Sequence, residues 1–289
     1  MPKARIIKII SNQYTIQDDQ RISVAAVRGK QRLKFKPAVG DLVEYEDKDD
    51  QTIILNVLPR MNHLLRPFVA NVDQALIVTS MKDPDYSEHL LNRLIFLSLL
   101  ANIRPRIVVT KSDMMDEESR KKIEEDLRWY EKAGYDVFYS HPGSDDELLE
   151  EILKDKVSVL CGQSGAGKSS LLNRLDPNFH LRTQEISKAL GRGRHTTRHC
   201  ELHPVAGGLV ADTPGFSSLD FTRLDVSDLD SRIPDFEQYI GECRFADCRH
   251  LKEPGCAVKE ALQEGRINPS IYEDYYQILT EADLKKKQY

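Results

Sequence analysis

The chain has 289 residues, of which 40% are apolar and 30% charged, and its formal net charge is −5. This length suits two or three modules, and the composition is that of an ordinary globular protein rather than a disordered one. The start of the chain lacks the apolar core of a signal peptide, and Asn92 and Arg93 interrupt the most apolar stretch, so we expect a cytoplasmic protein without a membrane span. Five cysteines, three of them between Cys243 and Cys256, fit a metal site in a reducing compartment better than a disulfide framework.

Residues 1–65 carry short segments of alternating apolar and polar residues with turn residues between them. Five such segments indicate a small β-barrel of the oligonucleotide-binding (OB) type, although the pattern does not separate it from an SH3-like barrel. The strands are predicted at 5–10, 13–17, 23–27, 41–46 and 52–57.

The first forty residues are basic although the whole chain is acidic. This charge favours contact with RNA phosphates, while a solvated sheet face would explain the same residues without RNA. Few aromatic side chains are present for base stacking. The basic residues are Lys3, Arg5, Lys8, Arg21, Arg28, Lys30, Arg32, Lys34 and Lys36.

From residue 71 the pattern changes to continuous apolar runs separated by helical periods, which predicts a parallel sheet with crossover helices. We expect strands at 74–79, 106–110, 136–139 and 157–161, and helices at 87–101, 116–133, 145–153 and 168–175. A strand pair at 199–203 and 208–211, joined by 204–207, follows, and the chain is helical from about residue 222. In the first of these helices the residues expected to face inward are Leu90, Leu91, Leu94, Phe96 and Leu97.

Residues 162–170 form a complete phosphate-binding loop, G-x-x-x-x-G-K-[ST], between a predicted buried strand and a predicted helix. The glycines let backbone N–H groups turn toward phosphates, Lys168 supplies a positive charge, and Ser169 offers a hydroxyl to Mg²⁺. The residues expected to hold the nucleotide are Gly162, Gln163, Ser164, Gly165, Ala166, Gly167, Lys168, Ser169 and Ser170.

Two switch segments are expected after this loop. Asp212-Thr213-Pro214-Gly215 follows a short apolar strand, as the D-x-x-G motif does in phosphate-loop GTPases. There Asp212 would reach Mg²⁺ through water and Gly215 would contact the γ-phosphate. In the basic segment 191–199 a threonine would coordinate Mg²⁺; we favour Thr197, which the sequence does not separate from Thr196, and a solvated basic loop is the alternative.

A guanine-reading motif lies upstream of the phosphate loop rather than downstream. Thr110-Lys111-Ser112-Asp113 resembles [NT]-K-x-D, in which the Asp carboxylate accepts hydrogen bonds from the ring N–H and the amine of guanine. The Lys stem covers the base face. Ser140 follows the next predicted strand, where a backbone contact to the base carbonyl is expected.

The motif order therefore differs from that of a Ras-like GTPase only in its starting point. The base motif and base-carbonyl loop come first, and the phosphate loop and two switches follow. A circular permutation produces this order when the original chain ends lie close together. The D-x-x-G switch then leads directly into the C-terminal module.

Cys243, Cys248, His250 and Cys256 have the spacing C-x4-C-x-H-x5-C. Three thiolates and an imidazole saturate a tetrahedral zinc ion, so we expect a structural site with no open position for water. Buried free thiols beside a surface histidine, or an iron site, are the alternatives. Cys161 and Cys200 are expected to be core residues on strands.

Together these residues resemble the circularly permuted family known as ribosome small subunit-dependent GTPase A, over nearly the whole chain. The resemblance also covers residues 66–74 and the loop end Glu253-Pro254-Gly255-Cys256. It implies a GTPase that acts late in assembly of the small ribosomal subunit, is stimulated by that subunit, and couples hydrolysis of GTP to GDP and phosphate with its own release. The barrel and the zinc module would contact ribosomal RNA.

This reading gives an OB-type barrel at 1–65, a permuted α/β GTPase domain at 66–221 and a zinc-binding helical domain at 222–289, in a protein expected to be a monomer. Phe216 stands where Ras-type enzymes place a water-orienting Gln, so we expect slow hydrolysis without a partner. His195 or the ribosome would supply the missing group, unless His195 is an ordinary loop residue. The alternatives from other classes are a small-molecule kinase or ATPase and a zinc-bearing RNA-binding protein with a passive nucleotide switch.

Overall fold

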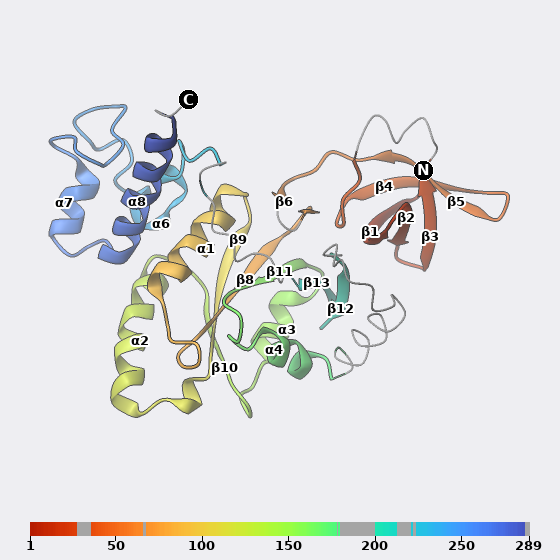
Figure 1. The fold of residues 1–289 in the computed structure, drawn as a ribbon, viewed down its shortest axis with the longest axis horizontal. Helices are drawn as coiled ribbons and strands as arrows, with labels where there is room; N and C mark the ends of the chain where they lie inside the picture. The colour runs from red at the N-terminus through yellow and green to blue at the C-terminus, as the bar shows by residue number, and fades with distance from the viewer. Residues whose placement is uncertain are drawn as a thin grey trace. The chain divides into compact units, whose positions relative to one another are not determined.

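The computed structural model describes residues 1–27, 36–65, 68–177, 179, 200–212, 221 and 224–286. These residues fall into two compact units. The first unit comprises Met1–Ala75, Asp145–Cys161 and Lys168–Phe216, and the second comprises Leu76–Ser144, Gly162–Gly167 and Ser217–Tyr289. Figure 1 shows the elements in chain order from red to blue.

A closed five-stranded barrel occupies the start of the first unit and confirms the expected barrel. Its strands run in the order β1-β2-β3-β5-β4, and antiparallel pairing of β1 with β4 closes it. Alternate residues point inward, and Ile6, Ile16, Val43 and Ile54 are at most 1% exposed. The strands are β1 (Lys3–Ile10), β2 (Gln13–Gln17), β3 (Ile22–Val27), β4 (Leu42–Lys48) and β5 (Gln51–Val57), and a short hairpin of β6 (His63–Leu65) and β7 (Phe68–Ala70) follows.

A six-stranded sheet has the order β10-β9-β8-β11-β13-β12. The pairs β10–β9 and β11–β13 are parallel, as the continuous apolar runs predict, and all five residues of β11 are buried. The strands are β8 (Gln74–Ser80), β9 (Arg104–Thr110), β10 (Val137–Ser140), β11 (Val157–Cys161), β12 (Leu202–Val205) and β13 (Gly208–Asp212).

Of the strand pair predicted at 199–203 and 208–211, the first strand lies further along the chain than predicted. The structure places β12 at Leu202–Val205 and the turn at Ala206 and Gly207, so Pro204 lies within the strand instead of in the turn. Pro204 is tolerated there because β12 is the edge strand of the sheet, where a missing N–H costs no ladder hydrogen bond. Cys200 is half-buried and lies before this strand rather than on it.

The helices confirm the predicted pattern of strands and crossovers. Ser87 and Asp116 cap α1 and α2 with their side chains, each accepting a hydrogen bond from a backbone N–H of the first turn. The helices are α1 (Glu88–Leu100), α2 (Glu117–Lys132), α3 (Glu147–Leu153), α4 (Lys168–Leu175), α6 (Pro234–Glu237), α7 (Ala257–Gln263) and α8 (Pro269–Lys286), with short 3-10 turns η2 (Ser112–Met114) and η4 (Asp230–Arg232).

Helix α1 is buried more completely than its sequence predicts. Leu91, Leu94 and Phe96 are buried as expected, whereas Leu90 and Leu97 are half-buried, and the polar Asn92, Arg93 and Ser98 are buried as well. The reason is α8, which lies beside α1 within the second unit (Figure 1). The Asn92 amide donates to Ser270 Oγ and Asp274 Oδ2, both at 2.7 Å, and its carbonyl accepts from Tyr130 at 2.6 Å.

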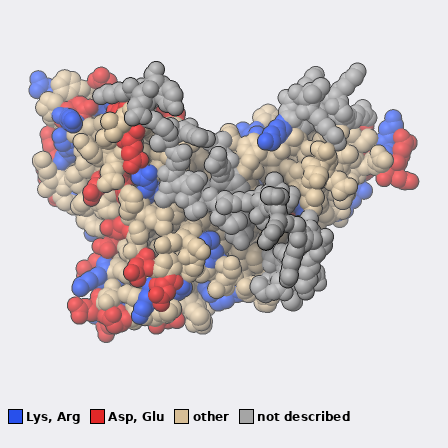
Figure 2. All heavy atoms as spheres, in the orientation of Figure 1, with Lys and Arg blue, Asp and Glu red and all other residues tan. Residues whose placement is uncertain are grey.

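Helix α2 carries charges of both signs on its exposed surface. Three ion pairs join residues four apart, at 2.7–3.6 Å. Figure 2 shows the resulting mixture of acidic and basic side chains in this region. Exposed pairs of this kind contribute little stability, about 0.3–0.5 kcal/mol each. In the part of the chain that the structure describes, no helix combines the length and apolarity needed to cross a bilayer.

Candidate functional site

The phosphate loop follows β11 and turns sharply at its glycines. Gly162, Gly165 and Gly167 have φ angles of 134°, 83° and 93°, a region that residues with a Cβ rarely adopt. A Cβ on Gly162 would lie 2.0 Å from the carbonyl oxygen of Val78, so only glycine fits there. Residues 163–165 are exposed, and α4 begins directly after the loop at Lys168. The loop therefore presents backbone groups outward at a helix N-terminus, as phosphate binding requires.

The base motif lies against this loop although the two are far apart in sequence. Thr110, the last residue of β9, donates from Oγ1 to the carbonyl oxygen of Ala166 at 2.6 Å. Both residues are buried, and the Thr110 side chain would stand 3.5 Å from a Cβ on Gly167. The threonine hydroxyl thus bridges the base motif and the phosphate loop.

Lys111 and Asp113 follow in a tight turn. Lys111 has a φ of 59°, and its ammonium donates to the carbonyl oxygen of Asp83 in the loop after β8. The ring of Pro84 in the same loop would lie 3.5 Å from a Cβ on Gly165. The Asp113 side chain is exposed, whereas Ser112 is buried in η2. The Asp113 carboxylate is therefore open to solvent, while the Lys111 ammonium is held at Asp83.

The remaining motifs begin at the carboxyl ends of strands, where ligands bind in parallel sheets. Ser140 ends β10 and pairs with Thr110 in the parallel register, so the base-carbonyl loop begins beside the base motif. Asp212 ends β13 and pairs with Leu160, two residues before Gly162. Ser169 and Ser170 are exposed on the first turn of α4, and Lys168 is half-buried. Below them, burial raises the pKa of Cys161 to about 12, which fits its expected place in the core.

Several predicted site residues lie outside the described residues, and their predictions stay as the sequence gives them. They are His195, Thr196, Thr197, Gly215 and Phe216.

The four predicted zinc ligands converge in the second unit. Their ligand atoms all lie within 4.8 Å of one another. His250 Nδ1 lies 3.5, 3.6 and 3.3 Å from the sulfurs of Cys243, Cys248 and Cys256, and the sulfurs of Cys243 and Cys256 are 4.0 Å apart. Tetrahedral zinc separates a nitrogen from a sulfur ligand by about 3.6 Å and two sulfurs by about 3.8 Å. The donor set and its spacing therefore fit zinc.

This cluster is enclosed by its surroundings. His250 and Cys256 are 2% and 3% exposed, and the backbone N–H of Ala257 donates to Cys243 Sγ at 3.3 Å. Burial raises the pKa of both Cys248 and Cys256, so a metal would have to displace their protons. Two hydroxyls of α8 hold the loop in place, because Tyr272 and Tyr275 donate to the carbonyls of His250 and Arg249 at 2.7 and 2.9 Å.

Sequence reasoning missed the residue that faces the other side of the histidine ring. Asp230 Oδ2 lies 3.4 Å from His250 Nε2. Asp230 is twenty residues upstream and carries no motif signal. Asn92 gave a weak signal, because it is a polar residue in the middle of an apolar helix.

The basic side chains of the barrel are partly engaged within the protein. Lys8 pairs with Glu201 at 2.8 Å, Arg21 pairs with Asp47, and Arg5 donates to the carbonyl oxygen of Gly40 at 3.0 Å. Partnered cations contribute less to an electrostatic surface. The charge argument for RNA binding therefore rests more heavily on residues 28–35, which lie outside the described residues.

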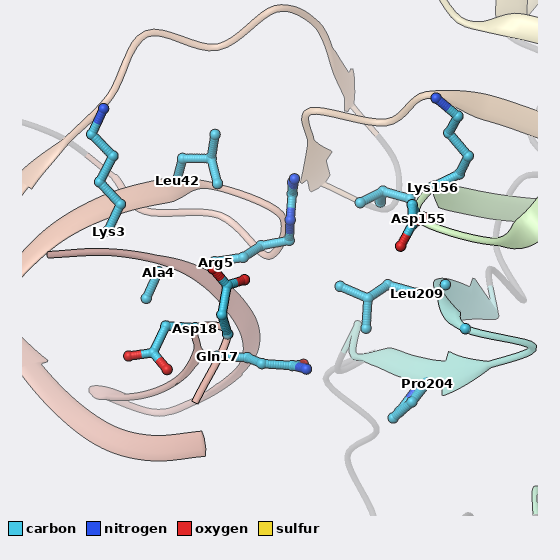
Figure 3. A pocket seen from close by; sticks show the side chains of 14 residues that line it. Lys3, Ala4, Arg5, Gln17, Asp18, Leu42, Asp155, Lys156, Pro204 and Leu209 are labelled. Carbon is cyan, nitrogen blue, oxygen red and sulfur yellow. The ribbon is translucent and has the colours of Figure 1, made fainter. Parts of the chain in front are cut away.

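The first unit also contains an open pocket of about 640 Å³ (Figure 3). No phosphate-loop or base-motif residue lines it. Its charged lining is balanced, with three basic residues, Lys3, Arg5 and Lys156, and three acidic residues, Asp18, Asp19 and Asp155. This balance does not favour a phosphate ligand, so the pocket is a poorer candidate for the nucleotide site than the phosphate loop.

Comparison with known proteins identifies similar sequences and structures. The family model described as RsgA GTPase matches residues 57–222, and the RsgA N-terminal domain matches residues 3–54. The small ribosomal subunit biogenesis GTPase RsgA of Bacillus cytotoxicus is 44% identical over 293 residues, and RsgA 2 of Oceanobacillus iheyensis is 45% identical, each covering 100% of both chains.

Two solved structures share the fold. The crystal structure of YloQ, a circularly permuted GTPase, has a TM-score of 0.83 and 37% identity, and covers 98% of this chain and 95% of that one. YjeQ from Thermotoga maritima has a TM-score of 0.84 and 34% identity, and covers 97% of this chain and 98% of that one.

Proposed function

The chain belongs to the RsgA GTPase family, and we propose that it hydrolyses GTP to GDP and phosphate in the biogenesis of the small ribosomal subunit. Membership confirms the resemblance seen in the sequence. The observation that carries the proposal is the 2.6 Å hydrogen bond from Thr110 to Ala166, because it joins the base motif to the phosphate loop. A chain that reads guanine and binds phosphates needs these two motifs side by side.

We propose the following roles at the nucleotide. Backbone N–H groups of residues 162–167 and the start of α4 bind the phosphates, and Lys168 neutralises their charge. Asp113 accepts hydrogen bonds from guanine, Lys111 and Ser112 shape the turn that presents it, and the backbone at Ser140 contacts the base carbonyl. The hydroxyls of Ser169 and Thr197 and the carboxylate of Asp212 hold Mg²⁺, which neutralises charge on the phosphates during transfer, and Gly215 senses the γ-phosphate.

The catalytic group is proposed to come from the partner or from His195. Phe216 follows the D-x-x-G glycine, and an apolar side chain there cannot orient water by hydrogen bonding. Because this group is missing at position 216, we expect the protein alone to hydrolyse GTP slowly and the protein on the subunit to hydrolyse it faster. A catalytic group supplied in this way can raise the rate strongly. In related chemistry an arginine finger contributes a factor of about 10³–10⁵ in kcat.

We further propose the three-part division at 1–65, 66–221 and 222–289, with zinc held by Cys243, Cys248, His250 and Cys256 as a structural ion. The near-tetrahedral spacing of these ligand atoms supports zinc. The protein would act as a monomer in the cytoplasm, where its ribosomal partner is assembled, and would contact ribosomal RNA through the barrel and the zinc module. Because Lys8, Arg21 and Arg5 of the barrel already have partners within the protein, the basic segment 28–35 is the first place to test for RNA contact.

The experiment is hydrolysis of GTP measured with and without purified small ribosomal subunits at defined salt, since phosphate contacts weaken as salt rises. We expect a slow rate alone and a marked stimulation by small subunits but not by large ones. Lys168→Ala is the inactive control. A rate that the small subunit leaves unchanged would remove the ribosomal role, while loss of activity in Lys168→Ala would still support a GTPase.

His195→Ala separates the two sources of the catalytic group. If His195 acts on water, this variant keeps GTP binding but loses most of the stimulated rate. If the variant matches the parent protein, the ribosome supplies the group.

A further inference from the structure

The turn η4 makes contacts at both of its ends. At one end Asp230 Oδ2 faces His250 Nε2 at 3.4 Å. At the other end Arg232 donates to the carbonyl oxygen of Leu99 at 3.0 Å and to the Asn102 side chain at 2.5 Å. Leu99 and Asn102 lie at the C-terminal end of α1, where helix carbonyls lack partners within the helix. The turn is therefore held firmly against α1 while it faces the cysteine cluster.

The two nitrogens of the His250 ring have different surroundings. Nδ1 lies within 3.6 Å of three sulfurs, so this nitrogen is the one placed to bind the proposed metal. Nε2 must then carry the proton, and Asp230 is the acceptor in front of it. The ring is 2% exposed and packs edge-on against Phe236, with centroids 6.2 Å apart, so water has little access to replace this acceptor.

The carboxylate of Asp230 is itself oriented. Its Oδ1 accepts the backbone N–H of Ser231 at 2.9 Å, which leaves Oδ2 for the imidazole. Arg232 is fixed in turn by Asp228, at 2.5 Å. Each group in this chain of contacts has a partner that limits its rotation.

We propose that Asp230 is a positioning residue of the metal centre, which holds the His250 ring so that Nδ1 faces the three thiolates. A histidine ligand whose second N–H is bound to a carboxylate keeps the correct tautomer and orientation and becomes more basic, and losing such a partner typically costs about 10–100-fold in metal affinity. The inference rests on the proposed zinc site, because it assigns a residue to that same site.

The test compares zinc loss from purified full-length variants. Zinc content of the unchanged protein is measured first, and release to a chromogenic chelator in excess is then followed over time. Asp230→Ala is expected to release zinc about 10–100-fold faster. Asp230→Asn is expected to lie between Asp230→Ala and the parent protein, because its amide oxygen still accepts from Nε2 without a negative charge.

Two control variants separate the positioning of His250 from the mere loss of a negative charge and from a general loosening of the turn η4. Asp247→Asn removes one carboxylate from an exposed position of the same loop and is expected to release zinc as the parent does. Arg232→Ala loosens the turn from α1 but keeps Asp230, and its effect is expected to be several-fold smaller than that of Asp230→Ala. In cobalt-substituted protein, the visible absorption bands of Asp230→Ala are expected to shift, because the orientation of an imidazole ligand changes.

The outcomes distinguish the two levels of the proposal. A parent protein that carries no zinc contradicts the proposed zinc site itself. A parent with one zinc and an Asp230→Ala variant that retains it equally well, with unchanged cobalt bands, overturns the role of Asp230. Equal acceleration by Arg232→Ala and Asp230→Ala overturns it too, because loosening of the turn would then explain both.

Discussion

The phosphate loop (residues 162–170) and the cysteine loop (residues 243–256) are both proposed to bind ligands, yet they are built in opposite ways. In the phosphate loop residues 163–165 are exposed, and glycines at positive φ let the backbone face outward. In the cysteine loop the four ligand side chains converge, and His250 and Cys256 are almost completely enclosed. The first is suited to a ligand that enters and leaves in each turnover, the second to an ion that stays.

This difference predicts a separation of effects. Damage to the cysteine loop should lower stability, because α8 connects that loop to α1 through Asn92 and Asp274. Loss of a ligand-contacting side chain of the phosphate loop, as in Lys168→Ala, should lower nucleotide affinity and leave the melting temperature nearly unchanged.

The largest effect on stability is expected for Cys256→Ser, which replaces a buried thiol of the cluster. The variant should purify without stoichiometric zinc, and its Tm should fall by about 5–10 °C, as a loss of about 2–3 kcal/mol produces in a protein of this size. Metal analysis and calorimetry measure the two results. A zinc-free variant with the Tm of the parent would show that the closed loop is not a stabilising element.

Gly162→Ala tests the open loop. A Cβ at this position would lie 2.0 Å from the Val78 carbonyl oxygen, so the loop must shift and GTP affinity should fall by about 100-fold or more, an effect of about 3 kcal/mol. Gly134→Ala is the matched control, since Gly134 also has a positive φ but nothing lies within 4 Å of the added Cβ. Equal GTP affinities in the two variants would contradict this account of the loop.

Asp235 lies on α6, the helix whose Phe236 packs against His250. Its titration tests how well water is excluded from this part of the second unit. Burial raises the pKa of Asp235 to about 6, and in the part of the chain that the structure describes its Oδ2 is buried without a hydrogen-bond partner. A folded-state pKa above the unfolded value gives stability that is present at low pH and is lost as pH rises through about 6.

Asp235→Asn removes this titration and should be the more stable protein at neutral pH. Its advantage over the parent should grow by about 1.4 kcal/mol between pH 5 and pH 7 and change little above pH 7. Urea unfolding at a series of pH values gives the difference. An advantage that does not vary with pH would mean that Asp235 is not desolvated.

Thr110→Val should give the smallest effect. It removes the hydroxyl that donates to Ala166, at a cost of about 1 kcal/mol, so GTP should bind about fivefold more weakly. Thr110→Ser keeps the hydroxyl and should bind as the parent does. If both variants bind equally, the bridge does not support the loop.

The sequence predicted the elements whose signals are local. The bounds of β11 and α4 match the predictions at Val157–Cys161 and Lys168–Leu175, because buried strands, phosphate loops and helix starts are encoded in adjacent residues. The spacing within fourteen residues likewise predicted the cluster of Cys243, Cys248, His250 and Cys256, whose ligand atoms the structure brings together.

Long-range contacts could not be predicted in this way. Helical periodicity selects apolar residues, so it missed the buried Asn92, whose partners Ser270 and Asp274 lie far downstream. Pro204 was assigned to a turn, because the local sequence does not show that its strand lies at the edge of the sheet. Asp230 had no signal, since its role arises only when the turn η4 reaches His250.

The most direct test of the central claim, that Asp113 reads guanine beside the phosphate loop, is the nucleotide preference of Asp113→Asn. A carboxylate pairs with the N–H and amine donors of guanine, whereas an amide also offers a donor to the 2-oxo group of xanthine. In a competition binding assay the parent should prefer GTP to both ATP and xanthosine triphosphate, and the variant should lose GTP and gain xanthosine triphosphate. A parent that binds ATP as well as GTP, or a variant that keeps its preference for GTP, would contradict the account.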